Sequence, residues 1–271
     1  MELLDLPVHQ YGTADELRGN IRGALARGLP EFAPALCAHD GTFVIVGSGP
    51  SMPQFVDDLR AEKAAGRPIC AVNHAHDSLV TQGIEPTFFL TIDPRPRADY
   101  HLTTLPQDTI YLLASRVHPE MFDRLKDHKV MLWHAWADQD MADSIWDSRT
   151  AFLVGGGTTS GIRAINVGYI LGFRKFVLYG LDSCLAPDGK TKRFNGDGSG
   201  QMTKVQVGWF RGTEQGCDPQ SREFVSNYAM AMQAKDFNRV YVDMPNATFD
   251  VKGDGLLAAI VAQRKAMGLH A

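Results

Sequence analysis

The chain has 271 residues, of which 44% are hydrophobic and 21% charged, and its formal net charge at pH 7 is −4. This length and composition predict a globular protein with a sizeable core, and the slightly negative charge excludes a generally basic surface for nucleic acid or anionic membranes. No apolar run approaches the roughly 18 residues of a membrane span, and the first ten residues lack the pattern of a signal peptide, so we expect a cytoplasmic protein without membrane insertion.

Short apolar runs alternate with amphipathic segments along most of the chain. Strands are predicted at 42–47, 68–72, 87–92, 109–114, 129–133 and 175–179, and helices at 13–28, 52–65, 74–83, 118–127 and 159–171. Strands alternating with helices in units of this size predict right-handed βαβ crossovers. The fold class is therefore α/β, with a doubly wound, mostly parallel sheet and helices on both faces.

The last third of the chain breaks this rhythm. Residues 183–219 form a long Gly-rich, polar insert with a possible hairpin at 202–212, and long loops of this kind are usually substrate-covering segments, the alternative being a disordered insert. Beyond it, the pattern predicts a helix at 222–236, a final strand at 239–243 and a helix at 254–267. We therefore expect an N-terminal helical extension at 1–40, a nucleotide-binding domain at 41–250 and a C-terminal helix at 251–271.

A Gly-rich turn follows the first predicted strand in the stretch "TFVIVGSGPSMPQFV". Ligands of open parallel sheets bind beyond the carboxyl ends of the strands, where such a turn lets backbone N–H groups approach a phosphate at the start of the next helix. The alternative is an ordinary tight turn, because the motif matches neither G-x-G-x-x-G nor the Walker pattern. The candidate phosphate-binding residues are Gly47, Ser48, Gly49, Pro50 and Ser51.

Polar residues also follow three other predicted strands. Those residues are Asn73, His74 and His76 after the second strand, Asp93, Arg95 and Arg97 after the third, and Gly180, Asp182 and Ser183 after 175–179. Each alone reads equally well as a helix cap or a satisfied histidine, but together they converge at one edge of the sheet. Asp93 and Asp182 are candidate ligands for a hydrated Mg²⁺ held against a diphosphate, because Mg²⁺ prefers a few carboxylates, phosphate oxygens and water.

A second Gly-rich turn, Gly155 to Gly157, precedes "TTSG" at the start of the predicted helix 159–171. Thr159 and Ser160 can cap this helix, and its N-terminus, with Thr159, Ser160 and Gly161, is another candidate anion site. The alternative is an ordinary capped helix without a ligand.

Three blocks of the chain resemble known families. "VIVGSGPSM", "ICAVNHAHDSLVTQGIEPTFFLTIDPRP" and "GGGTTSGIRAINVGYILGFRKFVLYGLD" resemble, in this order, motifs of the Rossmann-like 6-hydroxymethylpterin diphosphokinase (MptE-like) family. They are also similar to bacterial CMP-sialic-acid-dependent sialyltransferases, although the catalytic histidine of those enzymes has no counterpart, since no His lies between His134 and His270. The resemblance implies a nucleotide phosphate site at Gly47 to Ser51, a nucleotide contact at Asn73, and donor or metal contacts at Asp93, Ser160 and Asp182.

The leading functional hypothesis is a nucleotide-dependent transferase, most concretely a Mg²⁺-dependent diphosphokinase that moves a diphosphate from ATP to a hydroxymethyl-type small-molecule acceptor. Asp93, Asp182 and Arg95 are its candidate catalytic residues, and basic side chains would neutralise charge on the transferred group. The alternatives are a glycosyltransferase that uses a nucleotide sugar and a non-catalytic nucleotide-binding or assembly protein. Aromatic residues within 130–146 are a candidate homo-oligomer interface. The further charge-neutralising candidates are Arg97, Lys190, Lys192 and Arg193.

Overall fold

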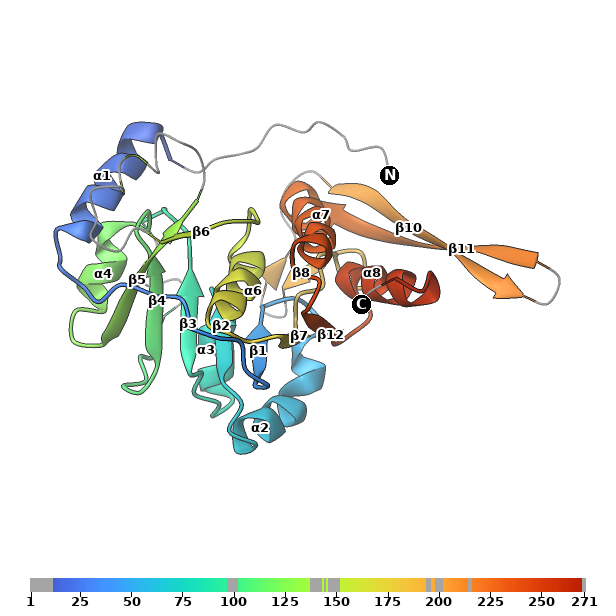
Figure 1. Ribbon diagram of the computed structural model, residues 1–271, viewed down its shortest axis with the longest axis horizontal. Helices are drawn as coiled ribbons and strands as arrows, with labels where there is room; N and C mark the ends of the chain where they lie inside the picture. The colour runs from blue at the N-terminus through green and yellow to red at the C-terminus, as the bar shows by residue number, and fades with distance from the viewer. Residues whose placement is uncertain are drawn as a thin grey trace.

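The computed structural model describes residues 12–96, 102–136, 143, 145, 152–193, 196–197, 202–213 and 216–269. Within them an eight-stranded sheet runs in the order β12-β7-β1-β2-β3-β4-β5-β6, and every neighbouring pair is parallel (Figure 1). The predicted α/β, Rossmann-like, doubly wound architecture is confirmed. The strands are β1 Thr42–Val46, β2 Ile69–Val72, β3 Phe88–Thr91, β4 Ile110–Ala114, β5 Lys129–Ala135, β6 Leu153–Val154, β7 Lys175–Tyr179 and β12 Thr248–Val251.

Helices cover both faces of this sheet (Figure 1). Successive residues of a strand point to opposite faces, and in β1 Phe43 and Ile45 join the larger core cluster while Val44 and Val46 join a second cluster on the other face. This double burial explains the continuous apolar runs in the sequence. The helices are α1 Ala14–Leu25, α2 Val56–Ala64 after a 3₁₀ turn at Met52–Phe55, α3 Ala75–Thr81, α4 Pro119–Arg124, α6 Ser160–Ile170, α7 Tyr228–Asp243 and α8 Leu256–Ala266.

The C-terminal third differs from the sequence-based prediction. Residues 222–227 belong to β11 Gly216–Asn227, which pairs antiparallel with β10 Met202–Thr213 along twelve residues, so the helix predicted at 222–236 begins only after Asn227. The strand predicted at 239–243 is wrong, because these residues form the last turns of α7. The apolar residues Val240 and Tyr241 fit the spacing of a helix, because with Phe237 they occupy positions i, i+3 and i+4 of one buried face.

The predicted insert contains two antiparallel pairs, the short pair β8 Thr191–Arg193 with β9 Gly196–Asp197 and part of the long ribbon β10–β11. The hairpin expected at 202–212 has the wrong limits, because these residues form the single strand β10 and the second strand of the hairpin is β11, beyond them. Its base is fixed to the domain, since Leu185 N donates to Val225 O at 2.8 Å and Ser226 Oγ to Ser183 O at 2.9 Å, while its far end projects from the body (Figure 1). A substrate-covering role for the insert stays a prediction.

Both ends of the described chain pack onto the same sheet. Thr13 caps α1 in a reciprocal capping box with Glu16, and the following segment lies along β5, where Phe32 N donates to Leu132 O at 2.7 Å. Apolar residues of α8 such as Leu256 and Leu257 belong to the larger core cluster. The described parts of 1–40 and 251–271 thus extend the main domain, and the domain limits proposed from the sequence stay predictions.

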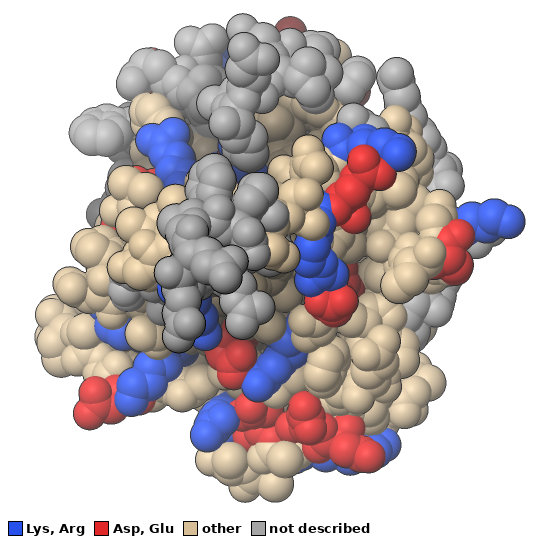
Figure 2. All heavy atoms as spheres, turned by 90° about the vertical axis from the view of Figure 1, so that its right-hand side faces the viewer, with Lys and Arg blue, Asp and Glu red and all other residues tan. Residues whose placement is uncertain are grey.

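The surface agrees with the near-neutral net charge on the side that carries the β10–β11 ribbon and α8. Figure 2 shows this side, where blue Lys and Arg side chains are interspersed with red Asp and Glu side chains. Arg222 and Asp254 form one such pair, at 2.6 Å. None of the described helices combines the length and apolar content that a bilayer crossing requires.

Candidate nucleotide-binding site

The candidate site lies where the strand order reverses. β2 to β6 extend from one side of β1 and β7 lies on its other side, so the carboxyl ends of β1 and β7 border the crevice in which doubly wound sheets bind ligands. The loops after these strands touch backbone to backbone: Gly47 N donates to Tyr179 O at 2.8 Å and Gly49 N to Gly180 O at 2.8 Å. A Cβ at Gly47 would lie 2.6 Å from Gly180 O. Glycine is therefore required here for close approach of two loops.

These hydrogen bonds change the expected role of the Gly-rich turn. The N–H groups of Gly47, Gly49 and Ser51 donate within the protein, to Tyr179 O, Gly180 O and Asp182 Oδ2. They are already used by the residues after β7, so the turn offers a phosphate mainly space and the hydroxyl of Ser48. The principal N–H donors must then come from elsewhere in the site.

The cavity encloses about 150 Å³, and most of the residues predicted from the sequence line it. Pro50 and Ser51 do not; Ser51 instead supports the site through Asp182. Met230 and Gln233 were not expected, since no sequence signal placed the face of α7 at this edge of the sheet. The predicted residues that line the cavity are Gly47, Ser48, Gly49, Asn73, His74, Thr159, Ser160, Gly161, Gly180, Asp182 and Ser183.

Helix α6 points its N-terminus at the cavity. Thr159 is the N-cap and accepts a bond from Ile162 N, and the first-turn residues Ser160 and Gly161 line the cavity. First-turn N–H groups have no acceptor within their own helix and lie at the positive end of the helix dipole. Ser160 Oγ accepts from Ile92 N at 3.3 Å, which fixes the helix start to the end of β3. The predicted anion site thus lies at the N-terminus of a capped helix that borders the cavity, and phosphate binding there stays a prediction.

Asn73 supplies a buried polar atom that lacks a partner. Its φ of 51° places it in the left-handed region, and Asn73 N donates to Leu90 O at 3.3 Å. Asn73 Oδ1 is buried, and among the described residues no group donates to it. A buried oxygen without a donor is destabilising by roughly 1–3 kcal/mol, and this one belongs to a residue that lines the cavity.

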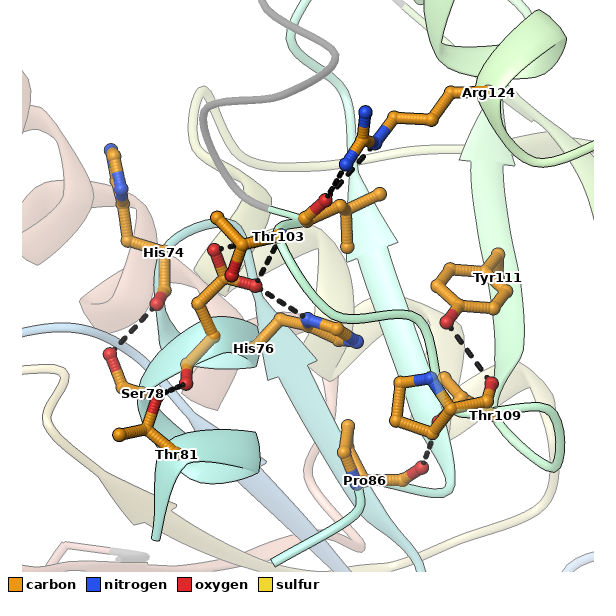
Figure 3. Close-up of polar contacts among 12 residues, drawn as sticks. His74, His76, Ser78, Thr81, Pro86, Thr103, Thr109, Tyr111 and Arg124 are labelled. Carbon is orange, nitrogen blue, oxygen red and sulfur yellow. Dashed lines mark hydrogen bonds and ion pairs between the residues drawn. The ribbon is translucent and has the colours of Figure 1, made fainter. Parts of the chain in front are cut away.

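The two histidines of "NHAH" have different surroundings (Figure 3). His76 is fully buried, with Nδ1 3.2 Å from Asp77 Oδ1 and its ring against Phe89 and Tyr111, so it is a core histidine. His74 lines the cavity, and its carbonyl oxygen accepts from Ser78 Oγ at 2.9 Å. Figure 3 shows the His74 imidazole directed away from His76. Of the two histidines, His74 is therefore the one that borders the cavity.

The candidate metal ligands lie apart. Asp182 lines the cavity with its carboxyl group buried, and this burial raises its pKa, while hydrogen bonding from Ser51 partly offsets the rise. Asp93 does not line the cavity and forms an ion pair with Arg95, whose Nε lies 2.7 Å from Asp93 Oδ1. β1 and β2 separate their strands, so the strand axes are about 14 Å apart, whereas Mg²⁺ binds each oxygen at about 2 Å. The strand order therefore favours Asp182 alone as the carboxylate of the cavity.

The other charged candidates lie outside the cavity or outside the described residues. Arg95 is engaged by Asp93, and Lys190 belongs to an exposed turn in which its N–H donates to Asp188 Oδ1 at 2.8 Å. Arg97 and the side chains of Lys192 and Arg193 lie outside the described residues. In the described part of the chain, no group of three or more His, Cys, Asp or Glu residues is arranged to hold a metal ion.

Comparisons with known proteins agree with this architecture. The Maf glycosyltransferase of Magnetospirillum magneticum AMB-1 superposes with a TM-score of 0.62 at 14% identity, so the two proteins share a fold. The superposition covers 95% of this chain and 43% of that one, so this chain spans less than half of that protein. A clostridial trans-2-enoyl-CoA reductase aligns at 8% identity over 98% of this chain and 67% of that one, with a TM-score of only 0.17. No curated protein matches the chain. Residues 20–188 match the family described as 6-hydroxymethylpterin diphosphokinase MptE-like, and because this is more than half of the sequence, the chain belongs to that family.

Proposed function

We propose that this protein is a nucleotide-dependent transferase that moves a diphosphate from ATP to the hydroxyl group of a small acceptor and releases AMP. The observation that carries the proposal is the buried, unpartnered Asn73 Oδ1 beside the first turn of α6, in a cavity at the reversal of the strand order. A nucleotide has groups that match both features of the cavity. Its phosphates can bind the N-terminus of α6, and its ribose hydroxyls or a base amino group can donate to Asn73 Oδ1. Membership of a family named for a diphosphokinase supports the choice of group.

We assign two roles to the residues of the cavity, which are phosphate binding and metal binding. The N–H groups of Ser160 and Gly161 and the hydroxyl of Ser48 would hold phosphate oxygens. Asp182 would hold Mg²⁺, which often binds through a single carboxylate, substrate phosphates and water. When bound, the ion would neutralise charge on the phosphates of the donor. Asp182 is kept in place by Ser51 N, so the carboxylate is oriented before any ligand arrives.

His74 is the residue that we assign to proton transfer. An acceptor hydroxyl must lose its proton as it attacks, and His is the side chain that most often accepts such a proton near neutral pH. His74 lines the same cavity as Ser160 and Asp182, and its backbone is fixed at the start of α3 by the bond from Ser78 Oγ. This bond fixes the backbone of a residue that borders the space in which we propose that substrates bind.

Glycosyl transfer from a nucleotide sugar is the second candidate, and the composition of the cavity favours it. Asp182 is the one acidic residue among those that line the described cavity, whereas Asp93 is neutralised by Arg95. A leaving nucleotide can be stabilised by first-turn N–H groups of α6 alone. The shared fold with a glycosyltransferase is consistent with this reading, at an identity too low to decide it.

A panel of nucleotides tests the proposal. The melting temperature is measured with ATP, GTP, CMP, CMP-sialic acid and UDP-glucose, each with and without Mg²⁺, because a ligand that binds the folded state raises it. Asn73→Gly keeps the positive φ and removes only the side chain, so we expect it to weaken nucleotide binding about tenfold. Asn246→Gly, at an exposed turn, is the matched control.

The outcomes separate the candidate functions. A shift with ATP that needs Mg²⁺, together with transfer of labelled diphosphate, supports the leading proposal, and His74→Gln should then keep the shift and lower turnover by about 10² or more. A shift with a nucleotide sugar that persists in EDTA favours glycosyl transfer. Absence of a shift with every nucleotide, or equal binding by Asn73→Gly and the wild type, would refute the site.

A further inference from the structure

A second cavity, of about 260 Å³, adjoins the candidate site. The two cavities share two walls, because the loop 155–161 and the helix α7 contribute residues to both. Gly156 and Gly157 face the second cavity and Thr159 to Gly161 face the first. The residues that line the second cavity are Trp136, Gly156, Gly157, Asn166, Asp236, Arg239, Val240 and Asp243.

Helix α7 contributes residues to both cavities, from two sides that are turned by about 100° from one another around its axis. Met230 and Gln233 line the first cavity, and Asp236, Arg239 and Asp243 continue along the helix at steps of three or four residues to line the second. At 1.5 Å per residue, the midpoints of these two groups are about 12 Å apart along the axis. This is the scale of one small molecule, and it is the separation that the proposed acceptor would have to span.

Trp136 gives the second cavity a flat apolar wall. Its backbone is fixed on both sides, since Trp136 N donates to Val154 O at 2.9 Å and Trp136 O accepts from Arg163 Nη2 at 2.6 Å. Arg163 is buried, which lowers its pKa to about 10 and leaves its guanidinium charged at neutral pH. The residue Trp136 is 41% exposed, which is unusual for so large an apolar residue with an anchored backbone. An anchored, exposed indole beside a cavity is suited to stacking on a ring.

The polar rim of the cavity is rich in acceptors. Asp236 uses Oδ2 to accept from Thr158 N and Oγ1, each at 2.7 Å, and Asn166 uses Nδ2 to donate to Ile162 O at 3.0 Å. These bonds use neither Asp236 Oδ1 nor Asn166 Oδ1, so both oxygens are acceptors that the cavity can offer to a ligand. Arg239 pairs with Asp243 at 3.4 Å, so the three ionised groups of the rim, Asp236, Asp243 and Arg239, sum to one negative charge. This rim disfavours anions and favours O–H or N–H donors.

From this geometry we infer that the second cavity binds the acceptor substrate, a neutral ring compound with a flat apolar face and several hydrogen-bond donors on its edge. The inference rests on the proposed transferase function for the identity of the ligand as an acceptor. The indole covers the flat face, and the oxygens of Asp236, Asn166 and Asp243 receive the donors. A nitrogen heterocycle with N–H groups and a neutral sugar both carry this chemistry, and binding measurements distinguish them.

Direct binding tests the inference without relying on turnover. Full-length protein is titrated by calorimetry with 6-hydroxymethylpterin and with a panel of neutral methyl glycosides, both with and without the nucleotide that gives the largest melting shift. Trp136→Ala should weaken binding of the ring about tenfold or more, and Trp136→Phe should retain most of it, because a ring face is preserved. Val242→Ala is the control, since Val242 lies on the same helix but is 72% exposed and lines neither cavity.

Each outcome bears on a separate part of the reasoning. Binding of one probe class that Trp136→Ala weakens, with an unchanged nucleotide shift, supports the second cavity and identifies the class. Failure of both probe classes against wild-type protein that does bind nucleotide would overturn the inference, as would equal ring binding by Trp136→Ala and the wild type. Ring binding that depends on Trp136 in a protein that binds no nucleotide would keep the second cavity as a ring site and refute the transferase proposal instead.

Discussion

Replacing Gly49 by alanine tests how closely the loops after β1 and β7 approach. An alanine Cβ would lie 2.2 Å from Asp182 Oδ2 and 2.6 Å from Gly180 O, both well below the 3.4 Å of ordinary contact. Asp182 is 6% exposed and holds Ser51 N, so its side chain has little room to turn. Gly180 O belongs to the backbone and must retreat by about 0.8 Å. Overpacking of this kind usually destabilises a protein by about 1–3 kcal/mol.

For a chain of this size such a loss corresponds to a melting temperature about 2–5 °C lower. Nucleotide affinity should fall as well, because the movement displaces Asp182 and the wall of the cavity. Calorimetric melting with and without nucleotide measures both effects. Gly19→Ala in α1 is the control: nothing lies within 4 Å of its Cβ, and alanine in a helix should stabilise the protein by about 0.5–1 kcal/mol. A Gly49→Ala protein with wild-type melting temperature and nucleotide shift would refute the close approach of these loops.

Two further predictions concern buried ionisable groups. Burial raises the pKa of Asp182 above its unfolded value of about 3.9, so the wild type should lose stability as the pH rises through the raised pKa, whereas Asp182→Asn should not. The melting temperature of Asp182→Asn relative to that of the wild type should therefore increase from pH 4 to pH 7. A difference that stays constant over this range would contradict the raised pKa. Iodoacetamide should modify the exposed Cys37 well before Cys70 and Cys184. Burial excludes the reagent from Cys70 and Cys184 and raises the pKa of their thiols, that of Cys184 to about 11. Peptide mass spectrometry measures the order of labelling, and early labelling of Cys70 would contradict its burial.

The parallel core was predictable from the sequence because its strands are buried on both faces. The run at 42–47 became β1 Thr42–Val46, and the run at 175–179 became β7 with the same limits. A continuous apolar run bounded by turn residues leaves few alternatives in an α/β pattern. The helix limits were longer than those observed by one or two residues at most ends, which is the usual uncertainty at fraying termini.

The C-terminal third was harder because local patterns there fit two structures. The segment Arg239 to Asp243 reads as a strand from its β-branched and aromatic residues, yet it completes the apolar face of a sixteen-residue helix. The preceding segment is strand up to Asn227, whose side chain then accepts from Met230 N at 2.9 Å and starts α7. A cap residue within a continuous polar and apolar mixture gives a weak signal, so the limit between β11 and α7 depends on packing of the ribbon against α7 and α8.

The candidate site was predictable in its residues but not in their pairing, and the order of the strands explains the difference. A parallel sheet brings every carboxyl end to one edge, so Asp93, Asn73, Gly49 and Asp182 were all expected there. The order β7-β1-β2-β3 makes Asp182 a neighbour of Gly49 and Asn73, while Asp93 lies beyond β2 and pairs with Arg95. This order is fixed by the crossover that brings β7 back beside β1, and the residues of that crossover do not encode which edge it joins. Chemistry at this site is therefore best sought among the groups of β7, β1, β2 and α6, where first-turn N–H groups, Asn73 Oδ1, His74 and one oriented carboxylate surround a single cavity.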